Sequence, residues 1–284
     1  MYYHRYFLYK KKECIMYKRM LLSIIVATCA LMAFFSCSQA PQSSGYDMVP
    51  LEKSCLFVST VADTGDPQDV PLINKLRSWG CEVRVVAETE LTAMADSFTQ
   101  YDFAFLSETP NSSNFKPFRG HPLPLLNLEA YACAKADVLN WSTFPSAVAK
   151  YDPLPLRIAD GANVELTGGL ASGSELQLVT GTISSGEAEI GFIPTIQHIS
   201  IARIICDTLV NNMVAMMGVD SSAIESSGGL LTTACAVEKG MVLADGVSTT
   251  QYRAVTIGIH AYAFEYITDE AYAMIHAGIV WILK

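Results

Sequence analysis

The chain has 284 residues, of which 51% are hydrophobic, and it carries 28 acidic against 19 basic side chains. This length suffices for one large α/β domain. The first 36 residues hold six of the basic and one of the acidic side chains, so 13 positive and 27 negative charges remain beyond them, net −14. A chain this acidic offers no basic patch to a phosphate backbone, and we therefore expect no nucleic-acid partner.

The chain begins with the pattern of a secretory signal. The basic residues Lys18 and Arg19 precede a run of 16 mostly apolar residues from Met20 to Phe35, and small residues surround Cys37. A basic start, a short apolar core and a small-residue end are typical of a signal peptide. The apolar run is shorter than the roughly 20 residues that a membrane-spanning helix needs.

Because it ends in Phe-Ser-Cys, this segment resembles a bacterial lipoprotein signal, in which the cysteine becomes the lipid-bearing first residue. The resemblance implies a signal peptide over residues 1–37, with Met16 or Met20 as the biological start. It also implies a membrane anchor on Cys37 and a place in the bacterial cell envelope, facing the periplasm or the surface.

A polar stretch and then a folded body follow the signal. Residues 38–50 lack an apolar period and suit a flexible tether. A single domain is expected over residues 51–284. Strands are predicted at 55–60, 82–87, 101–108 and 124–128, and helices at 70–79 and around 91–98. Nearly continuous apolar strands that alternate with helices indicate a mostly parallel sheet covered on both faces.

The second half of the body has a different texture. Glycines separate short β-like runs over residues 151–196, which indicates a Gly-rich β extension within the 150–220 region. No glycine motif of a phosphate-binding loop follows a strand there. Residues 198–218 are ambiguous between a helix and two strands. The chain closes with a strand at 254–259 and a helix at 269–283.

Five stretches in this order resemble the class I glutamine amidotransferase-like superfamily, nearest its trehalose-utilisation (ThuA-like) branch. They are CLFVST at 55–60, EVRVV at 82–86, YDFAFLSETPNSS at 101–113, LPLLNLEAYA at 123–132 and RAVTIGIHAYAFEYITDEAYAMIHAGIVWIL at 253–283. The resemblance implies a flavodoxin-like three-layer α/β sandwich, into which the β-rich segment at about 151–196 is inserted.

The resemblance also locates the residues that an active amidotransferase would need. That superfamily places a nucleophilic Cys after the fourth strand and a His-Pro-Glu motif after the late strand. Here Glu129 stands at the Cys position, and His260 is retained but followed by Ala261 and Tyr262. Without a nucleophile and an orienting carboxylate, no glutaminase mechanism remains. Cys133, one helical turn further on, is either a thiol activated by a helix N-terminus or a buried packing residue.

Polar side chains gather at the predicted carboxyl ends of the strands, where open α/β sheets bind ligands. They are Asp63, Ser107, Glu108, Asn111, Ser112, Glu129 and His260. Such a cluster suits a small hydroxyl-rich ligand such as a sugar, or a metal held by His and carboxylates, and we expect no organic cofactor. The alternative is that Glu129 caps the following helix and that His260 is a turn residue. His276 is expected on the surface of the closing helix.

Five cysteines lie beyond the signal, at irregular spacing and without a CxxC pair. They are Cys55, Cys81, Cys133, Cys206 and Cys235. Buried free thiols are expected, and a disulfide in an oxidising compartment stays open.

Three functions follow from these features. The first is a lipid-anchored, non-catalytic module that binds a saccharide-type ligand. The second is a hydrolase or isomerase acting on carbohydrate, with Glu129 and His260 as acid and base. The third is a structural subunit of an envelope complex, whose partner surface would be Tyr262, Phe264 and Tyr266 on one side of an extended segment.

Overall fold

The computed structural model describes residues 45–141, 148–150, 156–159, 162–180, 190–194, 202–209 and 230–284. These residues belong to one compact unit, Ser44–Lys284. The predicted signal peptide, Cys37 and residues 38–44 of the tether lie outside the described residues. Within the described ranges, no helix is both long and apolar enough to cross a membrane.

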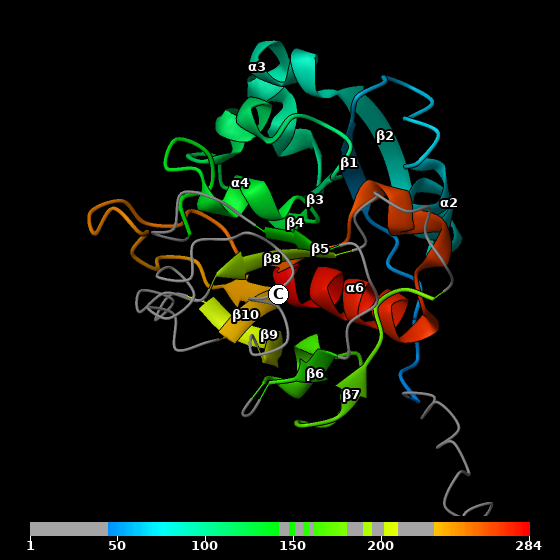
Figure 1. The fold of residues 1–284 in the computed structure, drawn as a ribbon. Coiled ribbons are helices and arrows are strands. Elements are labelled where there is room, and N and C mark those ends of the chain that lie inside the picture. The colour runs from blue at the N-terminus through cyan, green and yellow to red at the C-terminus, as the bar shows by residue number, and fades with distance from the viewer. Residues whose placement is uncertain are drawn as a thin grey trace, which may run out of the picture. The chain divides into compact units, whose positions relative to one another are not determined.

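Five parallel strands form one half of the sheet (Figure 1). In spatial order they are β2 (Glu82–Ala87), β1 (Ser54–Ser59), β3 (Phe103–Leu106), β4 (Leu125–Asn127) and β11 (Ala254–Ile257). Numbered along the chain, this is the order 2-1-3-4-5 of flavodoxin-like domains. The predicted α/β fold with a parallel sheet is confirmed.

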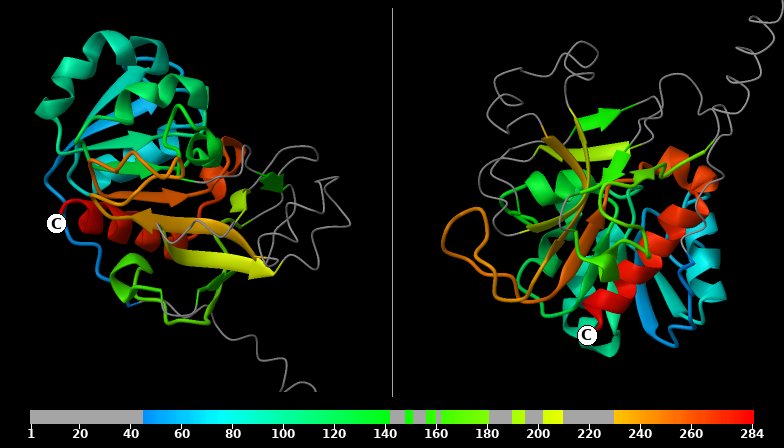
Figure 2. Two further views of the ribbon diagram at one scale, coloured as in Figure 1. Left: turned by 90° about the vertical axis from the view of Figure 1, so that its left-hand side faces the viewer. Right: turned by 90° about the horizontal axis from the view of Figure 1, so that it is seen from below.

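Antiparallel strands extend the sheet beyond β11. The path continues through β10 (Leu230–Val237), β9 (Ala202–Leu209), β6 (Leu156–Ile158) and β7 (Glu175–Leu176), while β8 (Ile190–Pro194) pairs with β10 and with β5 (Val148–Lys150). The predicted β extension is therefore present, and it continues the parallel sheet (Figure 2). Within the ambiguous segment 198–218, the described residues 202–209 form a strand.

Helical segments lie between the strands, and the last of them follow β11. They are α2 (Val70–Ser78), α3 (Leu91–Met94), α4 (Ala130–Ala134) and α6 (Asp269–Ile282), with 3-10 helices η1 (Glu88–Glu90), η2 (Ala95–Gln100), η3 (Ser112–Phe118), η4 (Val164–Leu166) and η6 (Ala261–Tyr266). The closing helix α6 has a complete N-terminal signal. Thr268 Oγ1 accepts a hydrogen bond from Ala271 N at 3.0 Å, and Asp269 and Glu270 place negative charge in the first turn, where the helix dipole favours it.

The strands send alternate side chains to two apolar layers, as a pleated sheet requires. Phe57, Phe105 and Val255 pack with α2 and α6 on one face. Leu56 and Ala104 face the other way, toward the layer of α3, η2, η3 and α4. Helices on both faces give the three layers predicted from the continuous apolar strands.

Among the described residues, the segment from Tyr46 to Leu51 packs on the domain, although it lies inside or next to the stretch expected to be tether. Leu51 N donates to Trp79 O at 2.7 Å. His276 on α6 holds the same segment, with Nε2 2.8 Å from Val49 O and Nδ1 3.0 Å from the Tyr46 hydroxyl. The prediction that His276 lies on the surface is wrong, because its side chain is fully buried. Hydrogen bonds to both ring nitrogens satisfy the polar atoms of this buried imidazole.

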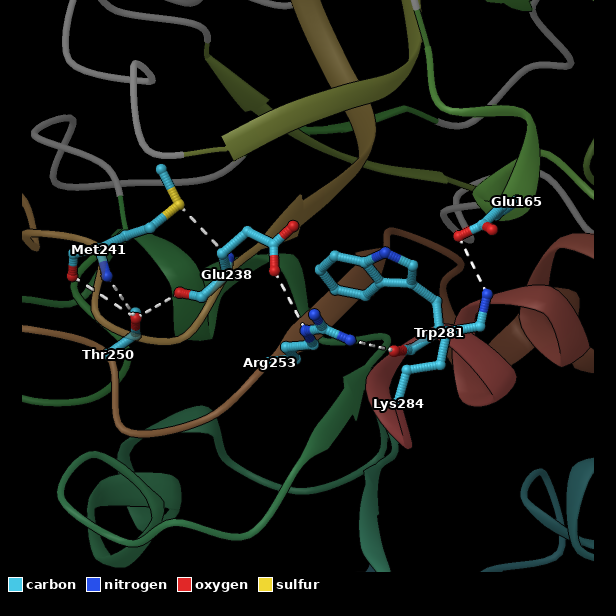
Figure 3. A network of polar contacts seen from close by, with 7 residues as sticks. All are labelled: Glu165, Glu238, Met241, Thr250, Arg253, Trp281 and Lys284. Atoms are coloured by element: carbon cyan, nitrogen blue, oxygen red, sulfur yellow. Dashed lines mark hydrogen bonds and ion pairs between the residues drawn. The ribbon is translucent and has the colours of Figure 1, made fainter.

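A network of polar contacts surrounds Arg253, which directly precedes the amino-terminal end of β11 (Figure 3). Arg253 Nε donates to Glu238 Oε2 at 3.1 Å, and its Nη1 donates to Trp281 O at 3.4 Å. Its guanidinium also lies 5.2 Å from the centre of the Trp281 ring. Lys284 pairs with Glu165 at 3.0 Å. Arg253 thus satisfies a carbonyl at the end of α6, as basic side chains often do at helix C-termini.

Candidate functional site

The carboxyl ends of three adjacent parallel strands bring Glu108, Glu129 and His260 into one region. Glu108 follows β3, Glu129 follows β4, and His260 follows β11. Since β4 pairs with both β3 and β11 in parallel, the three residues leave the same edge of the sheet. This is the edge at which open α/β sheets bind ligands.

Glu108 and His260 are in direct contact. His260 Nε2 lies 3.1 Å from Glu108 Oε1, and the two side chains are 21% and 13% exposed, so both are reachable from solvent. The second carboxyl oxygen of Glu108 accepts a hydrogen bond from Ala261 N at 2.8 Å. The Tyr262 ring stacks on the imidazole with a centroid distance of 5.6 Å. His260 Nδ1 is buried and has no hydrogen-bond partner among the residues that the structure describes.

Glu129 is the N-cap of α4. Its side chain is buried, and Oε1 accepts a hydrogen bond from Tyr131 N at 2.7 Å. Asn127 fixes the turn, because its side chain accepts from Glu129 N at 3.2 Å and donates to Glu129 O at 2.9 Å. The alternative in which Glu129 caps the helix is therefore confirmed. The carboxyl group in contact with His260 is that of Glu108.

Burial dominates the proton affinities of all three groups. Burial, together with the charge of Glu108, raises the pKa of Glu129 from 4.5 to about 8, against the hydrogen bond from Tyr131 N and the charge of Lys135. Burial likewise raises the pKa of Glu108 to about 7, against a hydrogen bond from Ala261 N and together with the charge of Asp69. Burial lowers the pKa of His260. A mutual ion pair would shift the Glu108 and His260 pKa values the opposite way, so burial outweighs the mutual attraction of the two groups.

The other predicted site residues divide into near and remote ones. Ser112 Oγ accepts from Lys135 Nζ at 2.7 Å, and the charge of Lys135 lowers the pKa of Glu129, so Ser112 borders the region. Asn111 accepts from Ser113 N at 3.0 Å and caps η3. Asp63 is mostly exposed and pairs with Arg84 on β2 at 3.4 Å, so its carboxylate is directed to β2 rather than to Glu108 and His260.

Ser107 leads to a buried residue that sequence reasoning missed. Its hydroxyl donates to Asp69, which also accepts from Ser59 and Thr109. In sequence, Asp69 stands directly before a helix, which marks it only as a helix cap. Hydroxyl residues at the ends of two neighbouring strands were the available signal that a buried carboxylate lies between them.

Cys133 is a packing residue. Its side chain is fully buried, with Sγ 3.2 Å from Thr256 Oγ1 and 3.4 Å from Asn127 Nδ2. Burial raises the pKa of this thiol well above its ordinary value, so it is not held as a reactive thiolate. Cys55, Cys81 and Cys235 are also buried and free, as expected; the side chain of Cys206 lies outside the described part.

Two further expectations concern metals and aromatic residues. Within the described ranges, no group of three His, Cys, Asp or Glu residues is placed to hold a metal ion. The predicted aromatic surface is wrong, because residues 261–266 form the 3-10 helix η6 and not an extended segment. Phe264 is consequently buried, whereas Tyr262 is 45% exposed.

Comparison with known proteins adds little to this geometry. No family model and no curated protein matches the sequence. A solved structure, a diacylglycerol kinase from Bacillus anthracis str. Sterne, is similar over 72% of this chain and 88% of its own, with 8% identity and a TM-score of 0.23. At that TM-score the similarity carries no argument. The strand order and the site define the class: an α/β domain of flavodoxin-like order with a Glu–His pair at the carboxyl edge of its sheet.

Proposed function

We propose that the protein is a lipid-anchored module of the bacterial cell envelope whose α/β domain binds a small, hydroxyl-rich ligand, with saccharides favoured. The observation that carries this proposal is the 3.1 Å contact between Glu108 and His260, two partly exposed side chains at the edge of the sheet where such folds bind ligands. The envelope anchor rests on the lipoprotein-like signal that ends at Cys37.

The chemistry around the pair fits sugar hydroxyls, which both donate and accept hydrogen bonds. Glu108 can accept when ionised and donate when protonated, and a pKa of about 7 makes both forms available. The exposed ring of Tyr262 beside His260 offers an apolar surface with a polar hydroxyl. The sequence resemblance to the trehalose-utilisation branch favours a saccharide by analogy only.

The test is a thermal-shift screen of residues 45–284 against sugars, sugar phosphates, amino acids and divalent metals. A ligand at 100 times its Kd should stabilise the native protein by about 2.7 kcal/mol. The Glu108→Gln/His260→Ala double variant should lose that response. Glu165→Gln, which changes an ion pair with Lys284 instead, should retain it. Saccharides without effect on the wild-type protein, or with equal effect on the double variant, would refute the proposal.

A second candidate is a hydrolase or isomerase acting on carbohydrate. The same contact favours it, since 3.1 Å is within hydrogen-bond reach for proton transfer. The acid–base pair is then Glu108 with His260, in place of the Glu129 and His260 expected from sequence. Turnover of a bound saccharide by the wild-type protein, lost in a Glu108→Gln variant that still binds, would support this candidate over simple binding.

A further inference from the structure

Asp69 is a fully buried carboxylate between the carboxyl ends of β1 and β3. Three hydroxyl groups donate to it: Ser59 Oγ at 2.5 Å, Thr109 Oγ1 at 2.7 Å, and Ser107 Oγ in a shorter contact. No ion pair to Asp69 occurs within the described ranges. A buried carboxylate is costly unless it is paired or hydrogen-bonded, so these three donors are what keeps it in place.

The helix that follows Asp69 does not account for this arrangement. Asp69 stands at the N-cap position of α2, yet its side chain makes no capping hydrogen bond to that helix. Its carboxylate oxygens instead accept hydrogen bonds from residues at the ends of the strands. Ser59 is the last residue of β1, and Ser107 and Thr109 lie just beyond β3.

Glu108 lies between two of these donors. Ser107 and Thr109 both reach Asp69, while Glu108 contacts His260 and Ala261 N. The chain bends at Glu108 and Thr109, just after the end of β3. Anchoring the residues before and after Glu108 to one buried carboxylate therefore fixes the backbone from which Glu108 reaches His260.

We propose that Asp69 is a positioning residue that holds Glu108 against His260 in the candidate ligand site. The inference rests on the proposed site and not on the identity of its ligand. Asp69 also acts through its charge, which raises the pKa of Glu108 in addition to burial. The other ionisable groups around Glu108 are Glu129, from the turn before α4, and His260, from the turn after β11.

The experiment follows the titration of Glu108 and His260 by NMR, in the wild-type domain and in Asp69→Asn, without any ligand. Removing a nearby negative charge should lower the apparent pKa of Glu108 by about half a unit or more. The matched control is Asp102→Asn. Asp102 ties β1 to β3 at their other ends, accepting from Ser54 N and Ser54 Oγ, both at 2.8 Å. This control should leave the pKa of Glu108 unchanged, whatever its effect on stability.

A second pair of variants covers the case in which Asp69→Asn does not fold. Thr109→Val removes one donor to Asp69 without changing the charge, and Thr109→Ser keeps it. Thr109→Val should alter the His260 titration, and Thr109→Ser should restore it. Identical titrations in folded Asp69→Asn and wild type, or in both Thr109 variants, would overturn the proposal. The titrations use no ligand. A thermal-shift screen without a hit would therefore refute the proposed function but would not change the outcome of the titrations.

Discussion

Glu129 shows how one buried carboxyl group makes stability depend on pH. The ordinary pKa of the group is 4.5, and burial raises it to about 8 in the folded protein. Between these values the folded state keeps a proton that the unfolded chain has released. Stability from this group is therefore fully present below about pH 4.5 and is lost as the pH rises through about 8.

Glu129→Gln should remove that loss, because the neutral amide oxygen can still accept from Tyr131 N. At pH 5 we expect the variant and the wild type to have similar free energies of unfolding. At pH 8 the variant should be more stable by about 1–3 kcal/mol. Urea unfolding at both pH values measures this, with the mostly exposed Glu165→Gln as control. A variant as pH-sensitive as the wild type would contradict it.

For single residues, the sequence predicts the position along a strand better than the direction in which the side chain points. Glu108, Glu129 and His260 were placed at the carboxyl edge because each follows an apolar run. Which carboxyl group meets His260 depends on side-chain directions in the turns after the strands, and no periodicity encodes those. The loop after β1 is similar: Asp63, in a left-handed conformation with φ of 64°, faces solvent, whereas the unpredicted Asp69 is buried.

Gly168 lies in a turn so close to α6 that an added side chain would collide with the helix. Its φ is +61°, and an added Cβ would lie 2.7 Å from the backbone carbon of Ala273 and 2.9 Å from its Cβ in α6. Gly173 has a similar φ of +78° with nothing within 4 Å of an added Cβ. Gly173→Ala should thus cost about 1–2 kcal/mol from the left-handed backbone alone.

Gly168→Ala should cost about 3 kcal/mol or more, because overpacking against α6 adds to the backbone term. Thermal or urea unfolding of the two variants measures the difference, which isolates the close approach to the helix. Equal losses in both variants would show that the chain near residue 168 moves away from α6 without cost.

His276 joins α6 to the segment that starts at Tyr46. Burial lowers its pKa, against a hydrogen bond to Val49 O and the charge of Asp47. The unfolded imidazole, with a pKa near 6.5, therefore takes up a proton more readily than the folded one. The stability contributed by this group is present above about pH 6.5 and is lost as the pH falls through the lower folded value.

His276→Leu should cost about 2–3 kcal/mol, since Val49 O and the Tyr46 hydroxyl lose their partner. Tyr46→Phe removes one hydrogen bond and should cost about 0.5–1.5 kcal/mol. Amide exchange at Leu51 N, which is bonded to Trp79 O, should accelerate in the same order. In the wild type this exchange should also accelerate below pH 6.5 relative to the global unfolding rate, and in His276→Leu that acid effect should disappear.

Element prediction succeeded where local pattern and tertiary position agree. The run at 254–259 is apolar because it is central in the covered sheet, and it contains β11, whereas the run at 82–87 forms the edge strand β2, in which only Val85 and Val86 are buried. The aromatic residues at 262, 264 and 266 alternate like a strand, yet they form η6. Their spacing reflects one buried ring, Phe264, within a turn, and such a short segment contains no second signal that separates the two conformations.

For the whole molecule, the sequence predicts the layers but not how the sheet continues. Parallel pairing follows from strands that alternate with helices. The antiparallel addition at β11 depends on β10 and β9, whose pairing is non-local in the chain. Gly-rich runs at 151–196 signal strands without assigning partners, because register and direction are set by the tertiary contacts that those strands make.

Membrane anchoring through Cys37 is a property of the whole chain, and it is tested apart from the folded domain. Eight residues, 38–45, stand between Cys37 and Tyr46, a described residue that packs on the domain, and eight residues of fully extended chain span at most about 28 Å. If Cys37 carries lipid, the apolar chains hold the protein at a membrane through about 0.8 kcal/mol per buried CH₂. Cys37→Ser should then move the protein from the membrane fraction to the aqueous fraction, while Cys29→Ser, within the apolar run, should leave it with the membrane.

Proteolysis between residues 38 and 45 should release a domain with unchanged Tm. Equal membrane retention of both Cys variants would contradict the anchor and would direct the search to residues 20–35.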